Sequence, residues 1–284
     1  MRSINLKKRP MTILLISSIF LIALFFLLNS KHLYVIRLNH YIVADDEKMV
    51  EKLLKNPKDI DFSFRHVLDY TVSAPLEKAA WYGNPTIVKM LLESGAKADS
   101  WGLDGRNALF TACSINYDYE TQKEIIVLLL EHGADVNRRG STTTPFGFYL
   151  SNHGRERYQS YFDNDLDYPD IRQEKYEILL LFMEYGLDLE ENGVYYLNSA
   201  TSGRTMEVVI YLVEEAGVDV DIKGPNTGRT PLMNASRVNA TEVVEYLLKQ
   251  GADKNIQDDD GRTALGYAKK YNADEVIQLL EEKE

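Results

Sequence analysis

Cysteine is almost absent from this sequence, and the one residue present, Cys113, cannot form a disulfide within the chain. The fold must therefore depend on packing alone. Basic residues are also scarce, because 32 Lys and Arg stand against 43 Asp and Glu and give a formal net charge of -11. This balance argues against a general nucleic-acid-binding protein, since phosphate groups require clustered Lys and Arg.

Sequence signatures of catalysis and metal binding are missing as well. The 5 histidines are not spaced as a zinc pair, and a single cysteine cannot complete a thiolate site. No G-x-S-x-G motif, phosphate-binding loop or dinucleotide fingerprint occurs. We therefore expect a chain that is not an enzyme and that uses no metal, cofactor or nucleic acid.

A long hydrophobic run without charged residues occupies residues 11–28. As a helix it would span roughly 27 Å, close to the ~30 Å core of a bilayer. We expect residues 1–30 to form a cytoplasmic tip and a retained transmembrane signal-anchor helix; a cleaved signal peptide and a buried soluble helix are the alternatives. More basic residues precede the run than closely follow it, which favours a cytoplasmic N-terminus and places the rest of the chain outside the cytoplasm.

A repeated unit fills most of the remaining chain. The stretch "GRTPLMNASRVNATEVVEYLLKQGADKNIQDDD" starts at Gly228, and Gly-Arg-Thr returns 33 residues later at Gly261. Further copies share a small residue in a first short helix, a Leu pair in a second helix and a following Gly; they begin near residues 74, 107, 144 and 195. One helix pair cannot bury its own apolar face, so stacked copies are expected.

These residues resemble the ankyrin repeat, whose Thr-Pro-Leu-His-x-Ala signature and 33-residue period are distinctive. Met233 replaces the histidine of the signature. The resemblance implies an all-α ankyrin-repeat solenoid, made of helix pairs with β-hairpin fingers and preceded here by one N-terminal transmembrane helix. We expect the ankyrin-repeat domain at residues 44–284, after a short linker at 31–43. Leu247 and Leu248 should both be buried between repeats.

Two insertions interrupt the pattern. Twelve residues separate Ala112 from Glu124, whereas seven separate the equivalent Ala235 and Glu242. A longer insertion lies at about 151–175 in the next repeat, and the two should be neighbours in space. Their aromatic residues stand among carboxylates, which suits an interface with a basic partner, and those assigned to partner binding are Tyr158, Tyr161 and Phe162. The alternative is a solvated loop whose aromatics pack back onto the solenoid.

The first-helix face carries a second group of candidate binding residues. In ankyrin proteins, partners commonly meet the finger tips and the concave face of the first helices. The resemblance places Trp81, Tyr82 and Arg237 at variable positions of that face, and Trp101 and Arg106 on a finger. Trp and Tyr are typical anchors of protein interfaces. The alternatives are packing of Trp81 against the N-terminal cap and a structural role for the finger arginines.

The sequence thus predicts a single-pass membrane protein whose ankyrin domain binds another protein and contacts the bilayer only through residues 11–28. The setting that fits best is a bacterial inner membrane with the domain in the periplasm. There the protein could be an immunity protein that neutralises a secreted antibacterial toxin such as a lipase, or a scaffold or inhibitor of a resident envelope protein. A further alternative is an accessory protein with an active insertion. The identity of the partner does not follow from the sequence.

Overall fold

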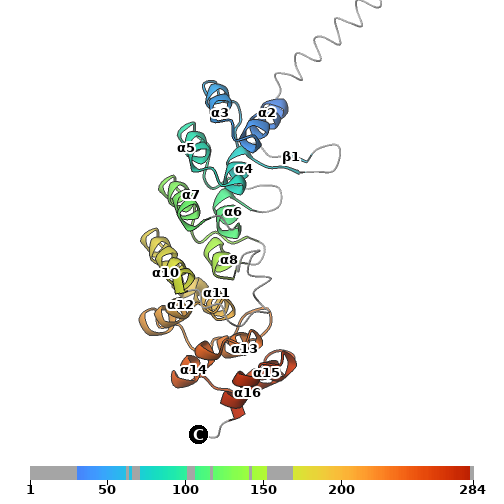
Figure 1. The fold of residues 1–284 in the computed structure, drawn as a ribbon, viewed down its shortest axis with the longest axis vertical. Helices are drawn as coiled ribbons and strands as arrows, with labels where there is room; N and C mark the ends of the chain where they lie inside the picture. Colours follow the sequence, from blue (N-terminus) through green and yellow to red (C-terminus); the bar gives the residue numbers. More distant parts are fainter. Residues whose placement is uncertain are drawn as a thin grey trace, which may run out of the picture.

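The computed structural model describes residues 31–61, 64–65, 71–100, 106–115, 118–140, 143–151 and 169–281. Within these residues the chain forms a stack of helix pairs, in which the first helices lie on one side and the second helices on the other (Figure 1). We call the two rows the inner and the outer helices. The inner helices are α2 (Lys31–Val43), α4 (Pro75–Tyr82), α6 (Ala108–Ser114), α8 (Pro145–Ser151), α11 (Leu189–Ser202), α13 (Pro231–Arg237) and α15 (Ala264–Lys270).

The outer helices are α3 (Glu47–Leu54), α5 (Pro85–Glu93), α7 (Tyr119–Glu131), α10 (Pro169–Glu184), α12 (Met206–Ile210), its π-helical continuation η2 (Tyr211–Glu215), α14 (Thr241–Lys249) and α16 (Asp274–Glu281). Each inner helix packs against the inner helix of the next repeat. The stack is therefore built from nearest-neighbour contacts, as expected for a solenoid.

Local signals in the repeat set the helix ends. Thr230 caps α13, because its hydroxyl accepts a hydrogen bond from the Met233 amide at 3.3 Å, and Pro231 occupies the first turn. Asn239 has a φ of 53°, which lets the chain reverse between α13 and α14. Gly251 has a φ of 89° just past α14, where the backbone turns toward the next repeat.

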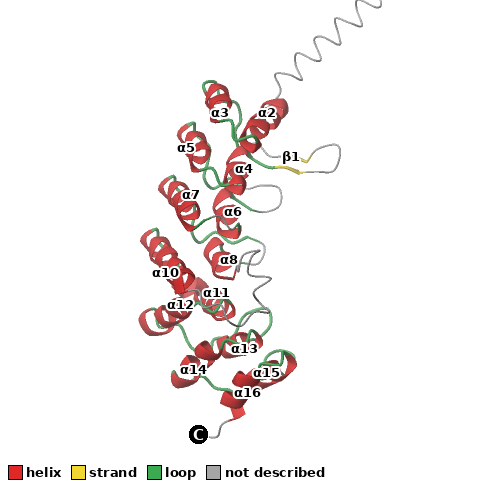
Figure 2. Ribbon diagram, in the orientation of Figure 1, coloured by secondary structure: helices red, strands yellow, loops and turns green. Residues whose placement is uncertain are grey.

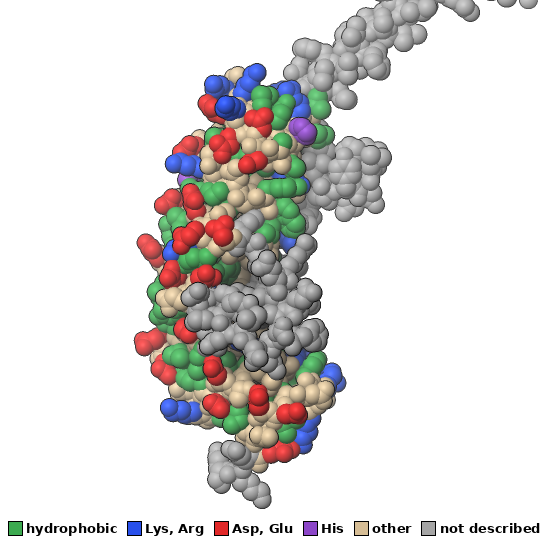
Figure 3. All heavy atoms as spheres, in the orientation of Figure 1, with side chains coloured by type: hydrophobic (Ala, Val, Ile, Leu, Met, Phe, Trp, Pro, Cys, Tyr) green, Lys and Arg blue, Asp and Glu red, His purple; other side chains and the backbone are tan. Residues whose placement is uncertain are grey.

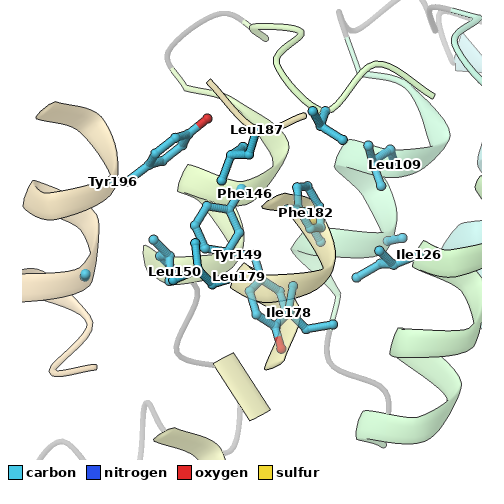
Figure 4. Close-up of a cluster of buried hydrophobic side chains, with 14 of the residues drawn as sticks. Leu109, Ile126, Phe146, Tyr149, Leu150, Ile178, Leu179, Phe182, Leu187 and Tyr196 are labelled. Carbon is cyan, nitrogen blue, oxygen red and sulfur yellow. The ribbon is translucent and has the colours of Figure 1, made fainter. Parts of the chain in front are cut away.

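The core runs through the stack between the two helix rows. Figure 4 shows one part of it, where Phe146 of α8 lies between Phe182 of α10 and Tyr196 of α11. The ring centroids of Phe146 are 5.3 Å and 5.2 Å from those of Phe182 and Tyr196, respectively. Burial raises the pKa of Tyr196, and Thr144 shares a hydrogen bond with its hydroxyl at 3.2 Å. Cys113 is also fully buried, so it acts as a small packing residue.

The N-terminal end of the stack differs from our expectation of a linker. Residues 31–43 form the inner helix α2, with Val35 and Leu38 fully buried. The Asn39 amide donates a hydrogen bond to the Ser73 carbonyl at 2.8 Å, which ties α2 to the start of α4. Together with α3, this helix makes a complete helix pair that covers the first full repeat.

The predicted fold class is wrong in its membrane component. Residues 11–28 lie outside the described residues, and no helix among the described residues is long and apolar enough to cross a membrane. The helices that the structure defines are amphipathic members of the stack, and the longest, α10, spans 16 residues. The N-terminal transmembrane helix and the lipid-bilayer contact through residues 11–28 are therefore not supported. The predicted single-pass membrane location, which depends on that helix, is not supported either.

The predicted β-hairpin fingers also need correction. Among the described residues the only strands are the two-residue pair β1 (Phe64–Arg65) and β2 (Thr71–Val72), which are antiparallel. The other described connections are turns and loops (Figure 2). Polar contacts, and not β-ladders, stabilise these connections. In the connection between α14 and α15, the Asp258 carboxylate accepts hydrogen bonds from the Arg262 amide at 2.8 Å and the Tyr267 hydroxyl at 2.5 Å.

The repeat that begins near residue 195 contains an extra residue in its second helix, which the alignment of the repeats with one another did not reveal. Eight residues separate Val209 from Gly217, whereas seven separate the equivalent Val244 and Gly251. The chain absorbs the extra residue as the π-helical turn η2, closed by a hydrogen bond from the Ala216 amide to the Tyr211 carbonyl at 2.9 Å.

The outer helices next to both insertions are joined by a polar bridge. Tyr119 and Lys123 lie at the start of α7, and both donate to Glu177 Oε2 in α10, at 2.5 Å and 2.8 Å. Burial and the hydrogen bond to Glu177 raise the pKa of Tyr119 to about 12. The start of α7 therefore lies beside the middle of α10. The inserted residues 116–117 and 152–168 themselves lie outside the described residues.

The two leucines of one repeat provide a test of the packing. Leu247 is fully buried, whereas Leu248, which we expected to be equally buried, is only partly buried against the core. Leu247→Ala should cost about 2–5 kcal/mol of unfolding free energy, as for other core leucines. Leu248→Ala should cost clearly less. Urea unfolding of the two variants measures the difference, and equal losses would contradict the observed packing.

The bridge between α7 and α10 provides a test with a defined pH dependence. Hydrogen bonds, from Lys123 first and then Tyr119, hold the pKa of Glu177 below its usual range. A lowered folded-state pKa stabilises the fold above the unfolded pKa of about 4.3, and this stabilisation is lost as the pH falls through the folded pKa. Glu177→Gln should therefore lower Tm at neutral pH, with a difference from wild type that shrinks in acid.

Glu93 offers a matched control for this experiment. Its carboxylate is 4.0 Å from Lys89 Nζ within the same helix, and both side chains are 60% exposed. Such an exposed pair contributes little, so Glu93→Gln should leave Tm nearly unchanged at each pH. A Tm loss in Glu177→Gln that stays constant from neutral to acid would show that charge at Glu177 is unimportant.

Candidate functional site

Exposed large hydrophobic side chains gather on the first two inner helices. Ile36 and Val43 of α2 are 36% and 45% exposed, and Trp81 and Tyr82 of α4 are 49% and 46% exposed. We call these four residues the α2–α4 patch. The remaining exposed large hydrophobics of the described residues are Leu180, Tyr185 and Tyr271. The patch is therefore the place where two adjacent helices both leave large apolar side chains in solvent.

Helix geometry explains why Trp81 and Tyr82 face outward. Ala79 and Ala80 are fully buried against the neighbouring helices, so the next residues lie beyond the packed face of α4. The helix ends at Gly83, whose φ is 69°, and Asn84 then caps α5 by accepting a hydrogen bond from the Ile87 amide at 2.8 Å. Because this turn is fixed, the two aromatic residues stand at a defined edge of the stack.

Contacts between the two helix pairs hold the patch together. The side chains of Asn84 and Asp45 form a short hydrogen bond that joins the turns after α4 and α2. Asp45 has a φ of 56°, which lets α2 end and α3 begin within three residues. The C-terminal ends of α2 and α4 are therefore fixed side by side, with Val43 and Tyr82 near these ends.

Cationic side chains border the patch. Arg37 of α2 is exposed, and Lys78 of α4 is partly exposed. Lys78 Nζ lies 5.5 Å from the centroid of the Tyr82 ring, in range of a cation–π contact. The patch thus combines aromatic and aliphatic surface with positive charge.

The other predicted site residues do not join this patch. Arg106 is partly buried, with its guanidinium 5.9 Å from the Phe110 ring. Arg237 ends α13, and three inner helices separate α13 from α4. Its buried Nε has no hydrogen-bond partner. Four predicted residues lie outside the described residues: Trp101, Tyr158, Tyr161 and Phe162.

Sequence reasoning missed the α2 half of the patch. Ile36 and Val43 were overlooked because residues 31–43 were assigned to a linker. A periodic signal was nevertheless present, since Val35, Leu38 and Ile42 are buried at the spacing of one helix face. Ile36 and Val43 are seven residues apart and therefore share one exposed side of α2.

The base of the longer insertion is also organised. Residues 169–175 of the predicted insertion belong to α10, which begins at Pro169. Lys175 is only 4% exposed, and its Nζ donates to the Leu150 carbonyl at the end of α8, at 2.8 Å. This bond satisfies a carbonyl where the chain leaves α8, and it fixes α10 against α8.

The described residues show no arrangement suited to metal binding. Among them there is no group of three or more His, Cys, Asp and Glu side chains that could hold an ion. The geometry at the α2–α4 patch instead suits non-covalent contact, because its groups are aromatic rings, aliphatic side chains and solvated cations.

The fold and this exposed surface define a helical-repeat protein of the solenoid type. A family model described as "Ankyrin repeats (3 copies)" matches residues 38–140, 171–258 and 217–284. The chain therefore belongs to the ankyrin-repeat family. Proteins of this family are typically non-enzymatic scaffolds whose repeats bind other proteins.

Known proteins with similar sequences share only part of their length with this chain. An ankyrin repeat, SAM and basic leucine zipper domain-containing protein of Equus caballus is 38% identical over 96 residues, which is 34% of this chain and 19% of that protein. An ankyrin repeat and KH domain-containing protein of Caenorhabditis briggsae is 27% identical over 197 residues, 65% of this chain and 7% of that protein. These animal relatives lend no support to the predicted bacterial inner-membrane and periplasmic location.

Solved structures agree in fold. The human ASB11 ankyrin repeat domain superposes with a TM-score of 0.61 at 19% identity, covering 87% of this chain and 98% of that domain. The ankyrin repeat protein EF0377 gives a TM-score of 0.53 at 24% identity, covering 74% of this chain and 97% of that protein. At these identities the likeness concerns the fold alone.

Proposed function

We propose that this protein binds a partner protein through the α2–α4 patch. The observation that carries the proposal is the exposure of Trp81 and Tyr82, at 49% and 46%, beside exposed aliphatic residues of α2. Aromatic side chains left in solvent on a rigid surface supply large contact area with little loss of conformational freedom. Family membership supports the proposal, since ankyrin repeats mediate binding to protein partners.

The patch suits an anchor role because the surrounding structure is already ordered. Ala79 and Ala80 are fully buried directly before Trp81, so the backbone that carries the aromatic residues is held by the stack. A preformed surface loses less entropy on binding than a loop that must first become ordered. Burial of the exposed parts of the aromatic rings would then contribute most of the affinity, while the edge of the patch contributes little.

Tyr271 provides a matched position for testing the patch. It follows α15, as the counterpart of Tyr82 in the last repeat, and it is 48% exposed against 46% for Tyr82. Its neighbour Lys270 lies 5.4 Å from the ring, much as Lys78 lies 5.5 Å from the Tyr82 ring. The two tyrosines thus differ mainly in whether adjacent helices extend the apolar surface.

A photo-crosslinking residue placed at each position tests the proposal in cells. Benzoylphenylalanine at position 82 should give a discrete covalent adduct with a partner protein after irradiation. The same residue at position 271 should not give that adduct. Adducts at 271 without adducts at 82, or equal adducts at both positions, would place the partner elsewhere and refute the proposed site.

A further inference from the structure

Charge is unevenly divided between the two helix rows. The sequences of the outer helices contain eighteen Asp and Glu against seven Lys and Arg. The inner helices contain three Asp and Glu against six Lys and Arg. The outer row therefore carries a net charge as negative as that of the whole chain, whereas the inner row is net positive.

The figures agree with this division. Figure 3 shows Asp and Glu side chains concentrated along the side of the stack that Figure 1 assigns to the outer helices α7, α10 and α12. An acidic protein would ordinarily repel an acidic partner. The positive inner row gives such a partner one side on which to approach.

Positive charge on the inner row coincides with apolar exposure at the α2–α4 patch. The 13 residues of α2 include no Asp or Glu, while Arg37 is exposed. The one acidic residue of α4, Glu77, is buried. Among the described residues, no ion pair involves Arg37 or Lys78. The exposed carboxylate at the end of α2, Asp45, accepts a hydrogen bond from the Asn84 amide instead.

The other end of the inner row has a smaller exposed apolar surface, because Tyr271 is the one exposed large hydrophobic side chain at α13 and α15 among the described residues. Lys269 of α15 forms an ion pair with Glu281 of α16 at 2.7 Å, so its charge is compensated within the fold. On α13, Arg237 stands at the helix end among residues that are buried or partly buried. Lys270 lies beside the exposed Tyr271 at the end of α15, but no neighbouring inner helix adds exposed large apolar side chains there, as α2 does beside α4.

We infer that the α2–α4 patch recognises an acidic segment of a partner protein, in which Asp or Glu residues flank at least one large apolar anchor. This inference rests on the proposed function and specifies the partner's chemistry. Trp81, Tyr82 and Val43, at the adjoining ends of α2 and α4, would bury the anchor, while Arg37 and Lys78 would face the carboxylates. The apolar contacts supply most of the affinity, and the charges select the partner and speed its approach.

A basic partner segment fits this surface poorly. Its Lys and Arg side chains would lie beside Arg37 and Lys78 without a neighbouring carboxylate, and like charges brought together disfavour the complex. The same basic segment would be drawn to the acidic outer helices, away from the aromatic residues. The charge pattern therefore favours an acidic segment at the patch.

Selection from a displayed library of random 16-residue peptides on the full chain tests the inference. Enriched peptides should be net negative and contain at least one Leu, Ile, Phe or Trp. Their affinities should fall about fivefold or more with Arg37→Glu or Lys78→Glu, and also as NaCl rises from 0.05 to 0.5 M, because exposed charge pairs are screened by salt. Lys89→Glu, on the outer helix α5, is the control and should leave affinity unchanged.

The variants separate failure of this inference from failure of the proposed site. Two outcomes would refute the acidic segment but not the proposed site. In the first, peptides that lose affinity with Tyr82→Ala are neutral or basic; in the second, their affinity is unchanged by Arg37→Glu and Lys78→Glu. If no enriched peptide depends on Tyr82, both the site and the inference are wrong. Tighter binding of a single-stranded RNA oligonucleotide to the same patch would also overturn the inference.

Discussion

Packing between neighbouring helix pairs is the interaction on which the rest of this structure depends. A single pair of short helices exposes most of its apolar surface, so each pair is stable only when another covers it. The fully buried residues Leu109, Phe146, Leu197 and Leu247 come from different repeats and belong to one continuous core. The chain has no disulfide to replace this contact, because its only cysteine is buried and unpaired.

The same constraint explains where a binding surface can form. Side chains that pack between repeats are needed for stability and are not accessible to a partner. The inner helices approach one another closely, because the small residues Ala79 and Ala80 are fully buried between them. Residues just beyond the packed face are free of that requirement. Trp81 and Tyr82 occupy such positions, and the rigid stack behind them holds their backbone in place. Stability and recognition thus use different residues of one short helix.

Much of the fold could be predicted from the sequence, because the repeat is encoded locally. Thr230, Pro231, Asn239 and Gly251 each specify one step of the turn–helix–turn path, and the structure confirms them. The resemblance to ankyrin repeats likewise placed Trp81 and Tyr82 at variable positions of the first-helix face, and both are exposed. Other features depend on contacts that no local pattern records. The role of α2 follows from its packing on α4, and the π-helical turn at Tyr211 follows from one extra residue within a helix.

The membrane prediction failed for a different reason. A charge-free run predicts a transmembrane helix from length and hydropathy alone, whereas the helices that the structure describes are short and amphipathic, and none among them is suited to crossing a bilayer. The division of charge between helix rows was also hidden in the sequence. It appears only when Arg37 and Lys78 are assigned to inner helices and the many glutamates to outer ones.

The central claim is that Trp81 is exposed for binding and contributes little to the fold. The most direct test measures two properties of one purified variant, Trp81→Ala: its urea unfolding and its affinity for the partner. The account predicts an unfolding free energy within ~0.5 kcal/mol of wild type, as for a surface substitution, and a loss of binding free energy of about 2 kcal/mol or more. A clear loss of stability with unchanged affinity would contradict the account, because Trp81 would then belong to the packing of the N-terminal helices.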